Sequence, residues 1–137
     1  FYEVETPAEV AIPPLGVTLR FKIVGAQDLG RAYNNAGRWC LDAQKLSGGL
    51  VLRNWRAGDR FWPTGCRKPL KLKELFRQRK IPLEQRRLWP VLLSGEEIVW
   101  VWGFSGAASV AASAASEKVL VITEESQVAK KARRELR

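Results

Sequence analysis

Lysine and arginine residues gather in one quarter of this sequence, at spacings that suit the binding of phosphate groups. Residues 53–87 hold twelve Lys and Arg against three Asp and Glu, so this segment carries the entire net charge of +9. The other residues have as many acids as bases. A charge confined to one segment of an otherwise neutral chain indicates a polyanionic partner. The candidate phosphate-binding residues are Arg53, Arg56, Arg60, Lys68, Lys71, Lys73, Arg77, Lys80, Arg86 and Arg87.

Three of these cations fall on one face of an expected helix. At 100° per residue, Lys73, Arg77 and Lys80 are separated by about 5–6 Å per turn, close to the repeat of phosphates along a strand. The arginines before the helix come from a strand end and a loop, where guanidinium groups can be held for bidentate contacts. The alternative is a solvated helix face beside scattered surface arginines. The neutrality of the rest of the chain favours phosphate binding.

RNA is the favoured polyanion, because the sequence contains no helix-turn-helix, zinc finger or basic zipper. RNA duplexes are recognised by shape and by phosphate and 2′-hydroxyl contacts, which suits a curved basic surface. Trp55 and Trp62 lie inside the basic segment and could stack on an exposed base. Alternatively, both belong to the core or rim of a small sheet. The other tryptophans are expected to pack inside the protein: Trp39, Trp89, Trp100 and Trp102.

The residue types available argue against a catalytic or metal centre. The chain has no histidine and only two cysteines, so Ser-His and Cys-His pairs are impossible and a tetrahedral zinc site lacks ligands. Cys40 and Cys66 are expected to be reduced. Gly58 and Asp59 are interpreted as loop-shaping residues, with Asp59 capping backbone amides or orienting an arginine. A catalytic role for Asp59 is the alternative, but no second carboxylate lies at a convincing spacing.

Period-two alternation and short apolar runs predict the strands that would position these residues. In residues 17–24, Val17, Leu19, Phe21 and Ile23 alternate with polar residues and are expected to share one face. The segment Ser47-Gly48-Gly49 is interpreted as a hairpin turn between two of the strands. Ser-Gly-Gly also opens the pyrophosphate-binding loop of adenylating enzymes, but there an Asp-Ser pair follows, whereas here the chain continues directly into the apolar strand 50–55. The other expected strands cover residues 1–5, 8–12, 38–43, 50–55, 91–93, 97–102 and 119–122, with 38–43 and 50–55 forming that hairpin.

Two consecutive helices are expected between the strands. Residues 70–80 place Leu72, Leu75 and Phe76 at helical spacing, and a shorter helix over residues 82–88 would begin at Pro82. Residues 26–37 and 56–69 are read as irregular, and the small-residue segment 105–116 as a flexible loop or a weak helix. The pattern predicts an α+β fold of mostly antiparallel strands with two inserted helices.

One domain is expected over residues 1–127, followed by a basic tail over residues 128–137. Within the domain we separate leading strands (1–40), a core (41–103), the flexible insert (105–116) and a closing strand (117–127). No apolar run is long enough to span a bilayer and no secretory signal opens the chain, so a cytoplasmic location without membrane partners is expected. The chain begins at Phe1 and contains no Met, which suggests a piece of a larger protein.

Residues 41–103 resemble the C-terminal domain of tRNA(Ile)-lysidine synthetase. The resemblance is carried by several short elements in the family's order: Leu41-Asp42-Ala43, the loop from Arg53 to Gly65 with its Gly-Asp-Arg-Phe, Lys71 through Phe76, Lys80-Ile81-Pro82, Arg86-Arg87, and Ile98 through Gly103. Residues 1–40 fit more loosely. The departures are Arg87, where the family commonly has Asp, and the insert 105–116.

The resemblance implies a tRNA-binding accessory domain of an ATP-dependent ligase that converts the wobble cytidine of isoleucine tRNA to lysidine. It also implies that ATP and Mg²⁺ are used in an N-terminal ATPase domain outside this chain, with no cofactor bound here. The partners would be tRNA and that N-terminal domain, and the fold would resemble a domain of the phenylalanyl-tRNA synthetase β subunit. The alternative is a basic docking module, between domains or between proteins, that meets an acidic partner.

Overall fold

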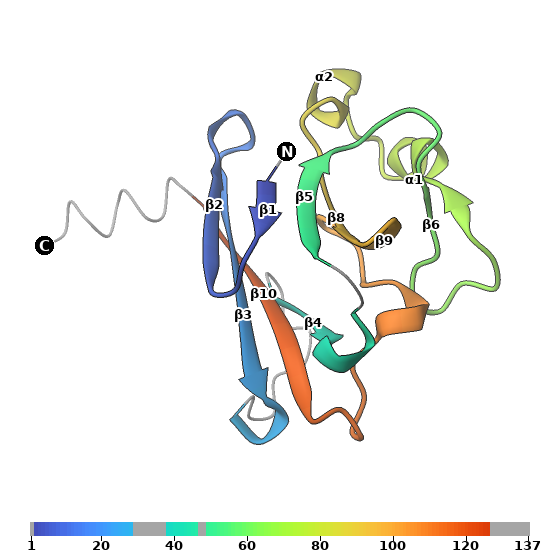
Figure 1. Ribbon diagram of the computed structural model, residues 1–137. Coiled ribbons are helices and arrows are strands. Elements are labelled where there is room, and N and C mark those ends of the chain that lie inside the picture. The colour runs from blue at the N-terminus through green and yellow to red at the C-terminus, as the bar shows by residue number, and fades with distance from the viewer. Residues whose placement is uncertain (1, 29–37, 47–48, 127–137) are drawn as a thin grey trace, which may run out of the picture.

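Two four-stranded antiparallel sheets form the body of the computed structural model, which describes residues 2–28, 38–46 and 49–126. The first sheet has the order β1-β5-β8-β9, and the second has the order β2-β3-β10-β4 (Figure 1). The strands of the first are β1 (Tyr2–Val4), β5 (Leu50–Asn54), β8 (Pro90–Ser94) and β9 (Glu97–Val101). Those of the second are β2 (Ala8–Ile12), β3 (Val17–Gly25), β10 (Lys118–Ser126) and β4 (Arg38–Asp42).

The main core lies between the two sheets. Trp100 of β9 is fully buried and contacts Phe21 of β3 edge to face, with ring centroids 6.4 Å apart. Trp39 of β4 packs on the same indole at 5.1 Å. Because aromatic pairs bury large areas and prefer such tilted contacts, Trp100 joins the two sheets at their centre. The expectation that Trp100 and Trp39 are packing residues is confirmed.

The predicted hairpin between residues 38–43 and 50–55 is wrong, although both segments are strands. β4 pairs with β10, where Leu41 lies opposite Leu120, and β5 pairs with β1 and β8, where Leu52 lies opposite Leu92. A short 3-10 helix, η3 (Ala43–Lys45), follows β4, and the Asp42 carboxylate caps it by accepting from the Gln44 amide at 3.0 Å. The chain therefore leaves one sheet before it enters the other. Ser47 and Gly48 lie outside the described residues.

The alternation in β3 holds for three of its four predicted core residues. Val17, Leu19 and Phe21 are buried, but Ile23 is 43% exposed. β2 pairs with β3 only from Val17 to Phe21, so the sheet is one strand narrower at Ile23. Ile23 therefore lies beyond the part of the core that the sheets enclose.

Two short helices and a two-stranded ladder complete the fold. They are α1 (Leu72–Gln78), α2 (Leu83–Arg86), and the antiparallel pair β6 (Arg60–Phe61) with β7 (Leu70–Lys71). The helix predicted over 70–80 begins two residues later, because its first two residues pair with β6. The second helix lies after Pro82 and is shorter than predicted. In the described residues the fold is mostly antiparallel β with two short helices, which confirms the expected antiparallel strands and the two inserted helices.

The small-residue segment 105–116, predicted as a flexible loop or a weak helix, packs against the body of the protein. It contains the 3-10 helix η4 (Ala108–Val110), and Val110 is 2% exposed. The Ser116 hydroxyl, also buried, donates to the Asp42 carboxylate at 2.9 Å. Small side chains let this segment approach closely, since an added Cβ at Gly106 would lie 2.1 Å from Leu41. Residues 128–137 lie outside the described part of the chain.

Within the described ranges, no helix is long and apolar enough to cross a membrane.

Candidate nucleic-acid interface

The basic segment folds into one region of the molecule. Residues 53–87 run from the end of β5 through β6, β7, α1 and α2, and all of them are described. In Figure 1, β6 and α1 lie on the far side of the first sheet from the second sheet. We call the exposed cations of this segment the basic surface. They are Arg56, Arg60, Arg67, Lys68, Lys71, Lys73, Arg77, Arg79, Lys80 and Arg87.

α1 is anchored by a buried stripe that leaves its cationic face in solvent. Leu72, Leu75 and Phe76 are buried as predicted, and Phe76 lies among the rings of Trp55, Trp89 and Phe104. Of the three cations predicted on one face of this helix, Lys73 and Arg77 lie on it and are exposed. Lys80 is exposed too, but it lies two residues beyond the end of the helix, so the prediction that places it on the helix face is wrong. Because the apolar stripe fixes the rotation of the helix about its axis, the outward direction of Lys73 and Arg77 is fixed as well.

The β6–β7 ladder places two cations side by side. Arg60 and Lys71 are direct partners in this antiparallel pair, and both are exposed while Phe61 is buried. Neither forms an ion pair with a carboxylate of the described residues. Like charges directly opposite in a ladder are destabilising by a few tenths to about 1 kcal/mol. An anion bound between Arg60 and Lys71 would relieve that repulsion.

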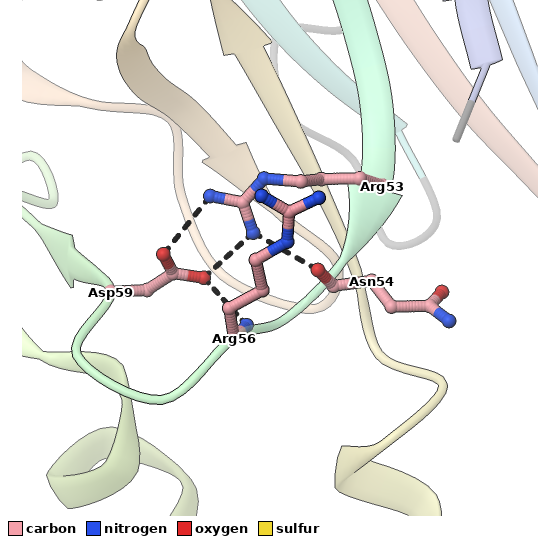
Figure 2. Close-up of polar contacts among 4 residues, drawn as sticks. All are labelled: Arg53, Asn54, Arg56 and Asp59. Carbon is pink, nitrogen blue, oxygen red and sulfur yellow. Dashed lines mark hydrogen bonds and ion pairs between the residues drawn. The ribbon is translucent and has the colours of Figure 1, made fainter.

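A carboxylate holds the first arginine of the segment. The Arg53 guanidinium donates two hydrogen bonds to Asp59, from Nη1 to Oδ2 at 2.8 Å and from Nη2 to Oδ1 at 2.9 Å (Figure 2). Nη1 also donates to the Asn54 carbonyl at 3.0 Å. Both side chains are nearly buried, with 11% and 12% of their surfaces exposed. The sequence predicts Arg53 as a phosphate-binding residue, but its guanidinium is bound to Asp59 and to the Asn54 carbonyl.

The same carboxylate closes the loop that carries Arg56. Asp59 Oδ2 accepts from the Arg56 amide at 2.8 Å, and the Asp59 amide donates to the Arg56 carbonyl at 3.1 Å. Gly58 has a φ of 92°, which favours glycine, so the predicted loop-shaping roles of Gly58 and Asp59 agree with the geometry. Figure 2 shows the Arg56 side chain turned toward the Arg53–Asp59 pair.

These contacts set the charge state of Asp59. Partial burial opposes ionisation, but the hydrogen bonds from the Arg53 side chain and the Arg56 amide, with the positive charge of both arginines, outweigh it. The pKa of Asp59 therefore lies below its usual range. An Asp59 held ionised by two arginines is a structural anchor and a poor general base, which argues against the alternative catalytic role.

Three further arginines differ in how freely they can reach a ligand. Arg86 donates from Nε to the Ile81 carbonyl at 2.8 Å, and its guanidinium lies over the Phe76 ring. Arg79, which was not selected from the sequence, donates to the Gly103 carbonyl and lies 4.1 Å from the centre of the Phe104 ring. Arg77 contacts Glu74 at 3.5 Å, but both are largely exposed, so this pair is weak and exchangeable.

Lys80 has an unusual backbone conformation that directs the end of α1. Its φ is +56°, and it is the only residue other than glycine with a positive φ in the described part of the chain. The Ile81 amide donates to the Phe76 carbonyl and the Lys80 amide to the Arg77 carbonyl, the pattern of a Schellman helix end. Glycine is usual at this position, because a side chain there costs backbone energy. Here a cation occupies it.

The two tryptophans proposed for stacking differ in their surroundings. Trp55 packs edge to face on Phe76 with ring centroids 5.4 Å apart, so it belongs to the core, the alternative reading. Trp62 is 45% exposed, and its indole N–H donates to the Cys66 carbonyl at 2.7 Å. Trp89 and Trp102 pack on each other at 4.6 Å, as expected. Only Trp62 of this group offers an exposed ring surface.

Metal binding finds no support in the described ranges, which contain no group of three or more His, Cys, Asp or Glu that could hold an ion. Cys40 and Cys66 are free thiols, the first buried and the second half-buried. The chemistry that the region offers is electrostatic: exposed lysine and arginine side chains on a rigid support, beside one exposed indole.

Several known proteins are similar to this chain in sequence or in fold. The family described as "TilS substrate C-terminal domain" matches residues 50–123. The tRNA(Ile)-lysidine synthase of Solibacter usitatus is 46% identical over 90 residues, which cover 66% of this chain and 20% of that protein. That of Symbiobacterium thermophilum is 37% identical over 102 residues, which cover 74% of this chain and 21% of that protein. The chain thus spans about a fifth of these relatives.

A solved structure described as "Crystal structure of TILS C-terminal domain" superposes with a TM-score of 0.78 at 25% sequence identity. The superposition covers 91% of this chain and 95% of that one. The likeness therefore includes the leading strands that the family match leaves out.

Proposed function

This chain belongs to the TilS substrate C-terminal domain family, and from that premise we propose that it binds the transfer RNA on which a tRNA(Ile)-lysidine synthase acts. In this proposal the chain is the substrate-holding part of an ATP-dependent ligase that converts the wobble cytidine of isoleucine tRNA to lysidine. ATP and Mg²⁺ are used in an N-terminal ATPase domain of the same enzyme. The role of this chain is to hold the RNA.

The basic surface is the observation that carries the proposal. Its cations project from α1, from the β6–β7 ladder and from the loops around them, and among them only Arg77 is ion-paired with a carboxylate of the described residues. The segment has the full net charge of the chain. Exposed cations that form no ion pair are available to phosphates, whose neutralisation releases counterions. Arg79 is less available than the others, because it contacts the Gly103 carbonyl and the Phe104 ring.

We divide the ten candidates into two groups by their exposure and their contacts within the protein. Eight belong to the basic surface and are proposed to contact phosphate: Arg56, Arg60, Lys68, Lys71, Lys73, Arg77, Lys80 and Arg87. Arg53 and Arg86 are engaged with protein groups, and we assign them positioning roles. Arg53 holds the loop of Arg56 through Asp59, and Arg86 ties α2 to the segment between the two helices through the Ile81 carbonyl. Rigid supports of this kind reduce the entropy that cations lose on binding.

Equilibrium binding of tRNA over a range of salt concentrations tests the proposal. If several phosphates are neutralised, log K should fall linearly with log salt, by about 0.7–0.9 for each phosphate. Saturable binding with a slope of several such increments supports RNA binding. Absence of saturable tRNA binding, together with binding to an acidic partner domain, would replace the proposal by the docking alternative.

A further inference from the structure

A cavity of about 350 Å³ lies beside the basic surface, between the loop that leads into β6 and the turn between β8 and β9. Phe61 and Ile98 contribute apolar lining, and Pro69 lies at the same cavity. Arg60, Trp62, Glu96 and Glu97 add charged and aromatic groups to it. The cavity therefore combines Arg60, which belongs to the basic surface, with an indole and two carboxylates that phosphate binding does not require.

Trp62 offers this cavity a ring whose polar group is already satisfied. Its indole N–H donates to the Cys66 carbonyl at 2.7 Å, which ties the side chain to the turn after β6. Nevertheless 45% of the residue is exposed. An exposed indole that is fixed in place suits stacking on a flat apolar surface, and unpaired nucleobases provide one.

The carboxylates of the cavity disfavour phosphate as its occupant. Asp59 is used by Arg53 and by the Arg56 amide. Glu97 accepts from the Ser109 hydroxyl through Oε1 at 2.5 Å, while Glu96 is exposed and forms no ion pair with the described residues. Carboxylates repel phosphate oxygens, but they accept hydrogen bonds from the amino groups of bases. Their presence next to exposed cations selects a ligand that has donors as well as negative charge.

We infer that this cavity binds one unpaired nucleobase that carries an amino group on its Watson–Crick edge. The base stacks on Trp62, its amino group donates to Glu96 or Glu97, and Arg60 contacts the adjoining phosphate. Guanine fits best, because its neighbouring N–H groups can donate to both oxygens of one carboxylate. Uracil fits worst, because carbonyl oxygens flank its single donor. This inference rests on the proposed function and adds base selection to it.

The test uses an RNA hairpin whose stem binds the basic surface. A four-nucleotide single-stranded tail carries G, C, A or U at every second position and U elsewhere, so the four RNAs have equal charge. Fluorescence anisotropy gives the dissociation constant of each. We expect the G tail to bind at least about fivefold tighter than the all-U tail, the lower end of what a good base-edge contact discriminates. Equal affinity for the four tails would overturn the inference.

The double substitution Glu96→Gln with Glu97→Gln separates base recognition from repulsion. If the carboxylates read the base, the preference for G over U should fall toward one while affinity for the U tail stays the same or rises. If they only repel RNA, all four affinities should rise by the same factor, which contradicts the inference. Trp62→Ala should weaken binding of all the amino-bearing tails, and Trp62→Phe, which keeps a ring, should restore most of it.

Thermal unfolding of each variant shows whether it folds like the unchanged protein. Glu96 and Glu97 are exposed, so the double variant should unfold at a similar temperature. Trp62 is less than half exposed and donates to the Cys66 carbonyl, so Trp62→Ala should unfold at a lower temperature, and its binding is measured where it remains folded. The two proposals fail in different ways. A hairpin that does not bind at all contradicts the RNA-binding proposal, whereas a hairpin that binds through its stem without preference among the tails contradicts only the base-recognition inference.

Discussion

Arg53 and Asp59 form a nearly buried ion pair with two parallel hydrogen bonds, and this pair connects the end of β5 to the loop that leads into β6. The same carboxylate accepts the Arg56 amide. One acidic residue thus determines the backbone path of a loop whose other charged residue is the cation Arg56.

Replacing Asp59 by Asn should destabilise the protein, because it leaves the nearly buried Arg53 without its charged partner. Charge-assisted hydrogen bonds of this kind contribute roughly 2 kcal/mol to the free energy of unfolding. Urea denaturation measures the change. Glu74→Gln is the matched control, since it removes the exposed partner of Arg77 and should change the free energy of unfolding by less than about 0.5 kcal/mol. Equal effects of the two substitutions would contradict the anchoring role of Asp59.

The same pair should make stability depend on pH. The pKa of Asp59 is lower in the folded protein than in the unfolded chain, so its stabilising contribution is complete above the ordinary Asp range and is lost as the pH falls through the folded value. The difference in unfolding free energy between the unchanged protein and Asp59→Asn should therefore be larger at about pH 7 than at about pH 3. Urea denaturation at the two pH values measures it, and a difference that is independent of pH would contradict the assignment.

Simultaneous substitution of Lys73, Arg77 and Lys80 by Ala should weaken tRNA binding and flatten its salt dependence. Each phosphate contact that is lost reduces the slope of log K against log salt by about 0.7–0.9. Filter binding over a salt series measures this slope. The control removes three exposed lysines in or next to the second sheet: Lys22, Lys45 and Lys118. It should leave the slope nearly unchanged, and equal effects of the two triple variants would mean that the site is not the basic surface.

Lys80→Gly should have opposite effects on stability and on RNA binding. Glycine adopts a positive φ without the cost of a side chain, so the free energy of unfolding should rise by about 0.5–1 kcal/mol. The lost cation should weaken tRNA binding at low salt. Lys80→Arg keeps the charge and the backbone cost, so it should bind tRNA like the unchanged protein. If Lys80→Gly binds tRNA with full affinity, Lys80 does not contact phosphate.

Local patterns in the sequence were sufficient to predict most elements of the fold. The apolar stripe Leu72, Leu75 and Phe76 fixed α1, because helical periodicity is a property of neighbouring residues. Strand pairing was harder to predict. Residues 38–42 and 50–54 are adjacent strands in the chain, yet each pairs with strands far away in sequence, and no local pattern indicates such partners.

For the candidate site too, some features could be predicted from the sequence and others depend on the fold. The location of the basic surface followed from charge composition alone, because exposed cations need no partner in the fold. The engagement of Arg53 and Arg86 did not follow from it, since both depend on which groups the fold brings near. An acid six residues after Arg53, with a glycine between them, was the signal for the first. The cavity had no such signal, because it brings together Trp62 and Glu96, which lie more than 30 residues apart in the sequence.

The position of the last strand has a consequence for the synthesis of this protein. β10 lies between β3 and β4. It pairs with β3 along its whole length, from Lys118 to Ser126, and with β4 from Val119 to Thr123. Apart from a single bridge between Leu41 and Ala111, β4 has no other strand partner in the described sheet, so most of it stays unpaired on the ribosome until residues 118–126 have emerged. A nascent chain that is halted before this point would expose an apolar strand edge and depend on chaperones, while the segment with α1 and α2 would already have emerged.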